Sequence, residues 1–255
     1  MTDATLAPQP TRRAARISVD RREPRSRGPW AWRDSVALAI AWRYATHALM
    51  VALALWNERR PAPTLPDSLL SIVPKVEWIA RHNYQLWFVA WVPVAVALLW
   101  KDRVSCVRFL WIGGWLSLLR GLTIPLTGLG PVDGLDANAG ASPDALWHSW
   151  LAIVNPITAL TTDAPHLGLT KDLFFSGHVA TTFLLWLYCR PHRRLATVAL
   201  VAHLATTAFV LLAHLHYAID VVAAWAIAFS IYVVVEGWSG LRSAGAAAAG
   251  TGTTR

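Results

Sequence analysis

The chain has 255 residues, of which 55% are hydrophobic and 15% charged, and it contains 15 tryptophans. A soluble domain of this length needs more polar surface, and the hydrophobic residues come in long blocks, so we predict a membrane protein. The formal net charge of +8 owes much to eight arginines in residues 1–33. No aromatic platform or known motif accompanies these arginines, so no nucleic-acid partner is expected.

The basic segment 1–33 is predicted to be a disordered cytoplasmic tail. It does not resemble a cleavable signal, because the apolar run starts only near Ser35, is too long for an h-region and lacks a small-residue cleavage site. The two cysteines, Cys106 and Cys189, lie near predicted cytoplasmic helix ends and indicate neither a disulfide framework nor a metal knuckle.

Six segments are apolar over roughly the 20 residues that a membrane-spanning helix needs. They cover approximately residues 34–56, 84–100, 104–124, 172–190, 195–216 and 217–237. The second is short, and we expect Tyr84 and Trp100 at its two membrane interfaces. The last two are nearly continuous, so His216 and Tyr217 are expected in a tight turn at one face of the membrane.

The distribution of lysine and arginine orients these spans. Sixteen lie on one side, in residues 1–33, 101–108, 190–194 and 238–255. The opposite side carries four in residues 57–83 and none in 125–170. Both termini are therefore predicted to be cytoplasmic, and the predicted fold class is all-α, a polytopic six-transmembrane-helix bundle.

Three regions follow from this topology. Residues 34–240 are expected to form the membrane domain, between the basic tail 1–33 and a disordered C-terminal tail at 241–255. The outer loop 125–170 is rich in Gly, Pro and Asp, and a short re-entrant or interfacial helix is expected near residues 146–158. The Ala/Arg-rich composition is compatible with a bacterium, so the predicted location is the inner membrane, with the outer face periplasmic.

Ionisable side chains of four spans converge on that outer face. His178 begins span four, His214 and His216 end span five, Asp220 begins span six, and Arg120 lies near the outer end of span three. An Arg or Asp at the centre of a span costs about 2.5–3.5 kcal/mol on insertion scales. Several such residues at one depth and one face therefore indicate a site.

The spacing of His216 and Asp220 suggests a chemistry. Residues four apart share one face of a helix, so the aspartate can accept the Nδ1 proton of His216 and leave Nε2 as a nucleophile or base. His178, from another helix, can serve as the complementary acid.

Anion-binding groups are expected beside these histidines. Gly177 allows an oxyanion to approach the backbone, Ser176 and the N–H groups at the helix start offer donors, and Arg120 offers a fork for phosphate oxygens. The set predicts phosphoryl transfer through a phosphohistidine, with no metal or cofactor.

Other interpretations remain open. An H-x-H pair with a further histidine and an aspartate can also bind zinc. His47 and His203 lie mid-span and are predicted to be packed or hydrogen-bonded, His214 to be supporting or structural, and Arg43 to be paired or snorkelling. A transporter or scaffold would instead spread its ionisable residues across the membrane depth.

Two stretches resemble known catalytic motifs. "DLFFSGH" at 172–178 and "HYAID" at 216–220 resemble the two motifs of the sphingomyelin synthase family, in the lipid phosphatase/phosphotransferase superfamily. "RGLTIPLTGLGPV" at 120–132 and "TLPD" at 64–67 resemble two further elements of that family. All four occur in family order, and the resemblance covers roughly residues 34–240.

The resemblance implies a reaction. His216, held by Asp220, would attack the phosphorus of a membrane phospholipid, and His178 would protonate the departing diacylglycerol oxygen. The headgroup would then pass to a lipid acceptor such as ceramide. By the same resemblance, Asp172 would tune His178 or contact the headgroup amine, and Arg120 would bind phosphate.

The chain also departs from the related patterns. Phosphatidic acid phosphatases have proline where Phe175 stands and an arginine where Val210 stands. The Cys-Gly of the synthases is replaced by Thr170 and Lys171, and the threonine after Ser-Gly-His by Val179. The headgroup and the acceptor (ceramide or diacylglycerol) stay open. So does the choice between transfer and hydrolysis of a phospholipase C or phosphatidate phosphatase type, in which water is the acceptor.

Overall fold

The computed structural model describes residues 35–134, 136, 138, 140–161 and 168–250. The basic segment 1–33 therefore lies outside the described residues. Every regular element in these ranges is an α-helix, which confirms the predicted all-α class there. The helices are α1 (Val36–Glu58), α2 (Glu77–Lys101), α3 (Arg103–Thr127), α4 (Pro143–Val154), α5 (Pro156–Thr161), α6 (Gly177–Cys189), α7 (Arg193–Leu212) and α8 (Ala218–Gly250).

Among the described residues, five helices are long and apolar enough to cross a membrane: α1, α2, α3, α7 and residues Ala218–Gly237 of α8. Each has at least 20 residues and so reaches about 30 Å, the thickness of the hydrocarbon core. Many large apolar side chains on their surfaces are exposed, including Leu38, Ile40, Trp56, Val89, Trp100, Leu204 and Val222. Outward apolar faces of this extent suit a lipid environment, and the chain is an integral membrane protein.

The predicted fourth span is a shorter helix in the structure. α6 has 13 residues, and residues 171–176 before it form no regular helix. It begins at Gly177 because the side chain of Ser176 caps it, accepting a hydrogen bond of 3.4 Å from the N–H of Val179.

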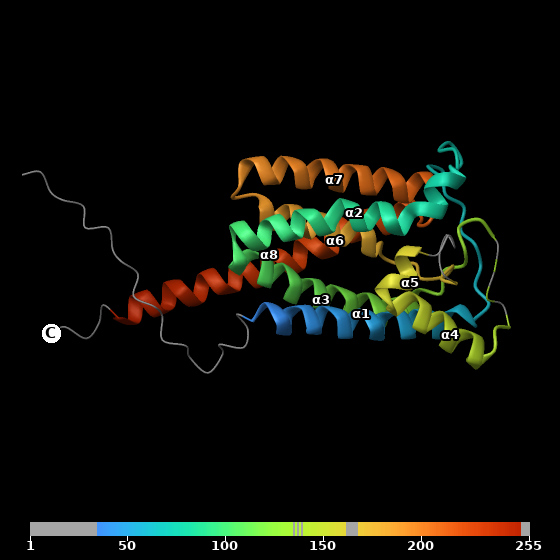
Figure 1. The fold of residues 1–255 in the computed structure, drawn as a ribbon, viewed down its shortest axis with the longest axis horizontal. Helices are drawn as coiled ribbons and strands as arrows, with labels where there is room; N and C mark the ends of the chain where they lie inside the picture. Colours follow the sequence, from blue (N-terminus) through green and yellow to red (C-terminus); the bar gives the residue numbers. More distant parts are fainter. Residues whose placement is uncertain (1–34, 135, 137, 139, 162–167, 251–255) are drawn as a thin grey trace, which may run out of the picture.

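The long helices lie side by side along the long axis of the molecule, and α4 and α5 lie across one end of the bundle (Figure 1). α1 packs on α3, α6 packs on α7 and α8, and α2 packs on α7. The two short helices confirm the expected helix near residues 146–158. α8 runs on beyond the bundle at the opposite end (Figure 1), so residues 241–250, predicted as a tail, are helical.

Close contact between α1 and α3 depends on glycine. A Cβ atom built on Gly114 would lie 2.2 Å from Nε1 of Trp42, and one on Gly121 would lie 3.0 Å from the Cα of Met50. Small residues allow helix backbones to approach this closely in membranes. The approach brings the polar residues of α1, Arg43 and His47, next to α3.

Candidate active site

His216 and Asp220 meet at the turn between α7 and α8. Nδ1 of His216 lies 3.3 Å from Oδ2 of Asp220, and both side chains are almost completely buried. The aspartate also accepts hydrogen bonds of 3.1 Å from the backbone N–H groups of Tyr217 and Phe174. Its backbone carbonyl accepts another, also 3.1 Å, from the N–H of Ser176. Asp220 therefore orients His216 and fixes the segment that precedes α6.

His178 faces His216 from the first turn of α6. The centroids of the two imidazole rings are 6.5 Å apart. The indole of Trp87, on α2, packs edge-to-face against the ring of His178, with 4.9 Å between centroids. Two histidines 38 positions apart in the chain thus present their imidazoles from different elements, and a third element limits the position of one of them.

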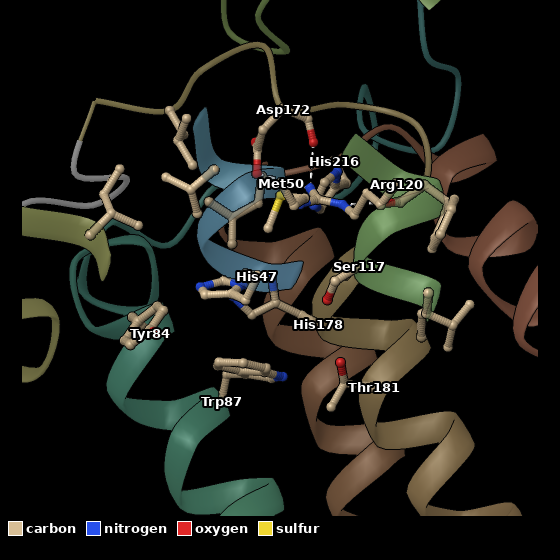
Figure 2. A pocket seen from close by; sticks show the side chains of 18 of the residues that line it. His47, Met50, Tyr84, Trp87, Ser117, Arg120, Asp172, His178, Thr181 and His216 are labelled. Carbon is tan, nitrogen blue, oxygen red and sulfur yellow. Dashed lines mark hydrogen bonds and ion pairs between the residues drawn. The ribbon is translucent and has the colours of Figure 1, made fainter. Parts of the chain in front are cut away.

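Both imidazoles line a cavity of about 110 Å³ (Figure 2). One end of the cavity carries Arg120, Asp172 and His216, and Trp87 lies at the other end (Figure 2). Much of the remaining wall is apolar, formed by Met50, Val51, Leu116, Ile153, Leu169, Phe175, Ala180 and Leu215. The cavity therefore combines a polar reaction zone with a wall suited to lipid.

Arg120 is tied to the segment before α6. Its Nη2 atom donates to Oδ2 of Asp172 (2.8 Å) and to the backbone carbonyl of Asp172, and its Nε atom donates to the carbonyl of Phe175 (2.8 Å). A Cβ atom on Gly177 would lie 3.3 Å from Nε of Arg120. The missing side chain of Gly177 therefore leaves room for the guanidinium group.

Ser176 differs from the expectation that it would offer a donor to an anion. Its side chain is fully buried, caps α6 and is not among the residues that line the cavity. The other six sequence-predicted site residues lie in one region: Arg120, Asp172, Gly177, His178 and His216 line the cavity, and Asp220 supports His216 from behind.

A buried network that sequence reasoning missed holds the segment before Asp172. The Glu58 carboxylate, at the end of α1, accepts hydrogen bonds from the backbone N–H and hydroxyl of Thr170, at 2.8 and 2.7 Å. The Lys171 side chain is 1% exposed, and its ammonium group pairs with Asp136 at 2.6 Å. The sequence gives two signs of this network: an acidic residue at the end of α1 and a lysine shortly before α6.

The remaining histidines divide between structure and site. His203 confirms the prediction of a hydrogen-bonded helix residue, because its ring contacts the hydroxyl of Thr182 and the indole N–H of Trp225, each at 3.0 Å. Nε2 of His214 lies 2.9 Å from a loop carbonyl, in keeping with a structural role. His47, in contrast, lines the cavity. Within the described ranges, no three His, Cys, Asp or Glu side chains are grouped to hold a metal ion.

The two further stretches that resemble the family, 64–67 and 120–132, meet at Tyr217, which precedes α8. Its hydroxyl accepts a hydrogen bond from the N–H of Leu65 and donates one to the carbonyl of Gly130, both 3.0 Å. The carboxylate of Asp67 accepts one from the N–H of Ala218. The stretches 64–67 and 120–132 are thus both attached to the turn that carries His216.

The comparisons with known proteins agree with these motifs. Residues 171–237 match the family model described as PAP2 superfamily C-terminal. Phosphatidylcholine:ceramide cholinephosphotransferase 1 of Sus scrofa is 28% identical over 239 residues, which cover 85% of this chain and 55% of the relative. The corresponding protein of Homo sapiens is 28% identical over 82% of this chain and 53% of its own length.

Phosphatidylcholine:ceramide cholinephosphotransferase 2 of Homo sapiens is also 28% identical, over 80% of this chain and 59% of its own. The chain thus spans little more than half the length of these curated relatives. The resemblance to the sphingomyelin synthase family is confirmed as a similarity: residues 171–237 match the PAP2 superfamily C-terminal model, and most of the chain is similar in sequence to phosphatidylcholine:ceramide cholinephosphotransferases.

Proposed function

We propose that this protein is a membrane phosphotransferase that moves the phospho-headgroup of a glycerophospholipid to the hydroxyl of a lipid acceptor such as ceramide. One observation carries the proposal: the imidazoles of His178 and His216 come from different elements, face one largely apolar cavity and lie 6.5 Å apart. The homology to ceramide cholinephosphotransferases supports the same reaction class.

In the first half-reaction, Nε2 of His216 attacks the phosphorus of the donor lipid. The bond between phosphorus and the diacylglycerol oxygen breaks, and His178 gives its proton to that oxygen. Asp220 accepts the Nδ1 proton of His216 in a hydrogen bond and stabilises the positive charge that forms on the ring. The products are diacylglycerol and a phosphohistidine that carries the headgroup.

In the second half-reaction, the hydroxyl oxygen of the acceptor lipid attacks the same phosphorus. His178, now neutral, takes the hydroxyl proton, and the bond between phosphorus and Nε2 of His216 breaks. Both histidines return to their starting states, so the cycle needs no external acid, base or cofactor. The apolar wall of the cavity favours a lipid acceptor by limiting the access of water.

The residues around the histidines have supporting roles in this proposal. Asp172 contacts the headgroup amine or tunes His178, and Arg120 holds Asp172 and offers its remaining donor to phosphate. Gly177 leaves room for Arg120, and Ser176 starts α6 so that His178 faces the cavity. Arg120 and Gly177 thus contribute to substrate binding partly through the shape of the site.

We also propose that residues 34–240 are a catalytic domain of six spans with both termini cytoplasmic. In this topology α6, together with the segment 172–176, is the span that leads from the outer face. The start of α6, which carries His178, and the turn between α7 and α8, which carries His216, lie toward the end of the bundle where α4 and α5 lie (Figure 1). That end carries few lysines and arginines, so it is the outer face, which would be the periplasm in a bacterial inner membrane.

The test is product analysis with purified protein in vesicles. A phospholipid labelled in its headgroup phosphate is supplied with ceramide, with diacylglycerol or with neither acceptor. The proposal expects the label on the added acceptor and little soluble label without one. Release of the label in soluble form under all conditions would instead identify a hydrolase, and retention of all label on the donor would exclude both activities.

A further inference from the structure

Arg43, on the membrane-spanning helix α1, is a second guanidinium group that lines the cavity. Its Nη1 atom donates to the carbonyl of Gly113 and to the hydroxyl of Ser117, and its Nη2 atom lies 3.0 Å from the hydroxyl of Thr181. All three partners are uncharged. No carboxylate of the described residues forms an ion pair with Arg43, in contrast to Arg120.

The charged side chains that line the cavity do not balance. Arg120 is paired with Asp172 at 2.8 Å, and its Nε and Nη2 atoms both donate to the segment 172–175. Asp220 lies behind His216 and does not line the cavity. Two guanidinium groups therefore face one carboxylate, so Arg43 adds a positive charge to the cavity that no carboxylate there balances.

An unpaired guanidinium is costly within a membrane-spanning helix. Hydrogen bonds to neutral oxygens lower that cost, but they leave the charge without a counter-ion. An anion that enters the cavity would supply the counter-ion, and a guanidinium fork matches the geometry of phosphate oxygens. The partners of Arg43 hold its guanidinium group in place before the anion arrives, which reduces the entropic cost of ordering this side chain on binding.

The position of Arg43 agrees with the reaction zone. Its partner Thr181 lies three residues after His178 on α6, so the two side chains share one face of that helix. Ser117 lies three residues before Arg120 on α3, by the same argument on the face that presents Arg120. Ser117 and Thr181 line the same cavity as His178 and Trp87 (Figure 2). The guanidinium that these hydroxyls hold therefore lies about one helical turn from His178.

We propose that Arg43, held by Ser117 and Thr181, is a binding site for a phosphate oxyanion in the catalytic cavity. The inference rests on the proposed function for its substrate, in which the oxyanion is a non-bridging phosphate oxygen of the donor lipid. Arg43 binds that oxygen from the side of α1, and His216 approaches the phosphorus from the turn before α8. Inorganic phosphate has the same chemistry and can occupy the same site.

The test measures binding without turnover. Purified full-length protein in detergent is titrated with short-chain phosphatidylcholine, with short-chain diacylglycerol and with inorganic phosphate, and the apparent melting temperature is followed. Three variants are compared with the wild type: Arg43→Met, Arg43→Lys and, as a matched control, Arg59→Gln. Arg59 is an exposed arginine just beyond the end of the same helix.

We expect phosphatidylcholine to bind the Arg43→Met variant about tenfold to a hundredfold more weakly than the wild type, as for one lost charged hydrogen bond. The melting temperature without ligand should not fall, because an apolar side chain in the span is cheaper to bury. Arg43→Lys keeps the charge but not the fork and should bind with intermediate affinity, whereas Arg59→Gln should match the wild type.

Stabilisation by phosphatidylcholine alone would identify a lipid headgroup as the ligand, and stabilisation by inorganic phosphate as well would identify any phosphate oxyanion. Both results support the site if Arg43→Met removes them. Wild-type affinity of Arg43→Met for phosphatidylcholine would overturn the inference. An Arg43→Met protein that is unfolded or less stable without ligand would also overturn it, because Arg43 would then be a structural brace. If lipid binds at Arg43 but no product forms, only the proposed function fails.

Discussion

The carboxylate of Asp67 accepts a hydrogen bond of 2.7 Å from the backbone N–H of Ala218, the first residue of α8. The same carboxylate accepts hydrogen bonds from the N–H groups of Leu69 and Leu70 in its own turn. A residue of the loop after α1 therefore caps the helix that carries Asp220. Negative charge at this end of α8 also interacts favourably with the helix dipole.

This contact predicts a stability that depends on pH. Burial raises the pKa of the Asp67 carboxyl. Hydrogen bonds from the N–H groups of Ala218, Leu70 and Leu69 lower the pKa by more than burial raises it, so the pKa lies below the ordinary value. The stabilisation is therefore complete above the ordinary pKa of about 4 and is lost as the pH falls through the lower, folded-state value.

Asp67→Ala should lower the free energy of unfolding by about 0.5–2 kcal/mol at neutral pH, as expected for a lost helix cap. The wild type should lose stability below pH 4. Asp67→Asn should lose less, because its amide does not gain a proton in this range. Thermal unfolding in detergent from pH 3 to 7 measures both effects. Asp144→Ala, whose side chain is 83% exposed in the wild type, is the control and should follow the wild-type curve.

The Asp220 carboxylate predicts a second effect, on turnover. Asp220→Asn can no longer hold a positively charged His216, so kcat should fall by about 10²–10⁴. His216→Ala removes the nucleophile and should abolish headgroup transfer. His192→Gln changes a histidine near Asp102 at the opposite end of the bundle and should leave turnover unchanged. Wild-type turnover by His216→Ala in folded protein would refute the nucleophile assignment.

The sequence predicts the long helices well because the residues that determine them lie close together in the chain. The run 104–124 corresponds to α3, and this helix begins where Asp102 accepts a hydrogen bond of 3.0 Å from the N–H of Ser105. The i, i+4 contact of His216 and Asp220 is local in the same sense, since four residues along the chain determine it. The prediction that His216 lies in a turn between two apolar runs is local as well, and the structure places this residue between α7 and α8.

What sequence reasoning missed depends on contacts between distant segments. α6 starts at Gly177 rather than near residue 172, in part because Asp220 accepts hydrogen bonds from the backbone of Phe174 and Ser176, more than 40 residues away. Arg43 looked like an ordinary paired or snorkelling residue, because its partners lie on α3 and α6. No pattern within α1 indicates that this side chain faces the cavity.

The buried carboxylate of Glu58 predicts a link between stability and activity. Glu58→Ala leaves the N–H and hydroxyl of Thr170 and the N–H of Lys171 without their acceptor. Such a loss should cost about 1–3 kcal/mol of stability, and it loosens the segment that places Asp172. Transfer activity at saturating donor and the unfolding midpoint should therefore both fall. The control, Glu77→Ala, removes a side chain that is 68% exposed.

If the segment before Asp172 needs no such support, Glu58→Ala should unfold at a lower temperature but keep its wild-type kcat. That result would show that Glu58 contributes to stability but not to turnover. Glu58→Gln offers a finer test, since an amide oxygen can still accept one of the hydrogen bonds. Its activity should lie between those of Glu58→Ala and the wild type.

Two helical glycines should respond in opposite directions to the same substitution. Gly114→Ala would place a methyl group where the indole of Trp42 lies, and we expect α1 to move away from α3, at a cost of about 1–3 kcal/mol. Gly237→Ala meets nothing within 4 Å, and alanine is favoured over glycine in a helix interior by about 0.5–1 kcal/mol. Thermal unfolding of both variants measures the difference. Because Arg43 follows Trp42 directly, Gly114→Ala should also weaken binding of phosphatidylcholine. Unchanged stability of this variant would show that the indole adapts without moving the helix.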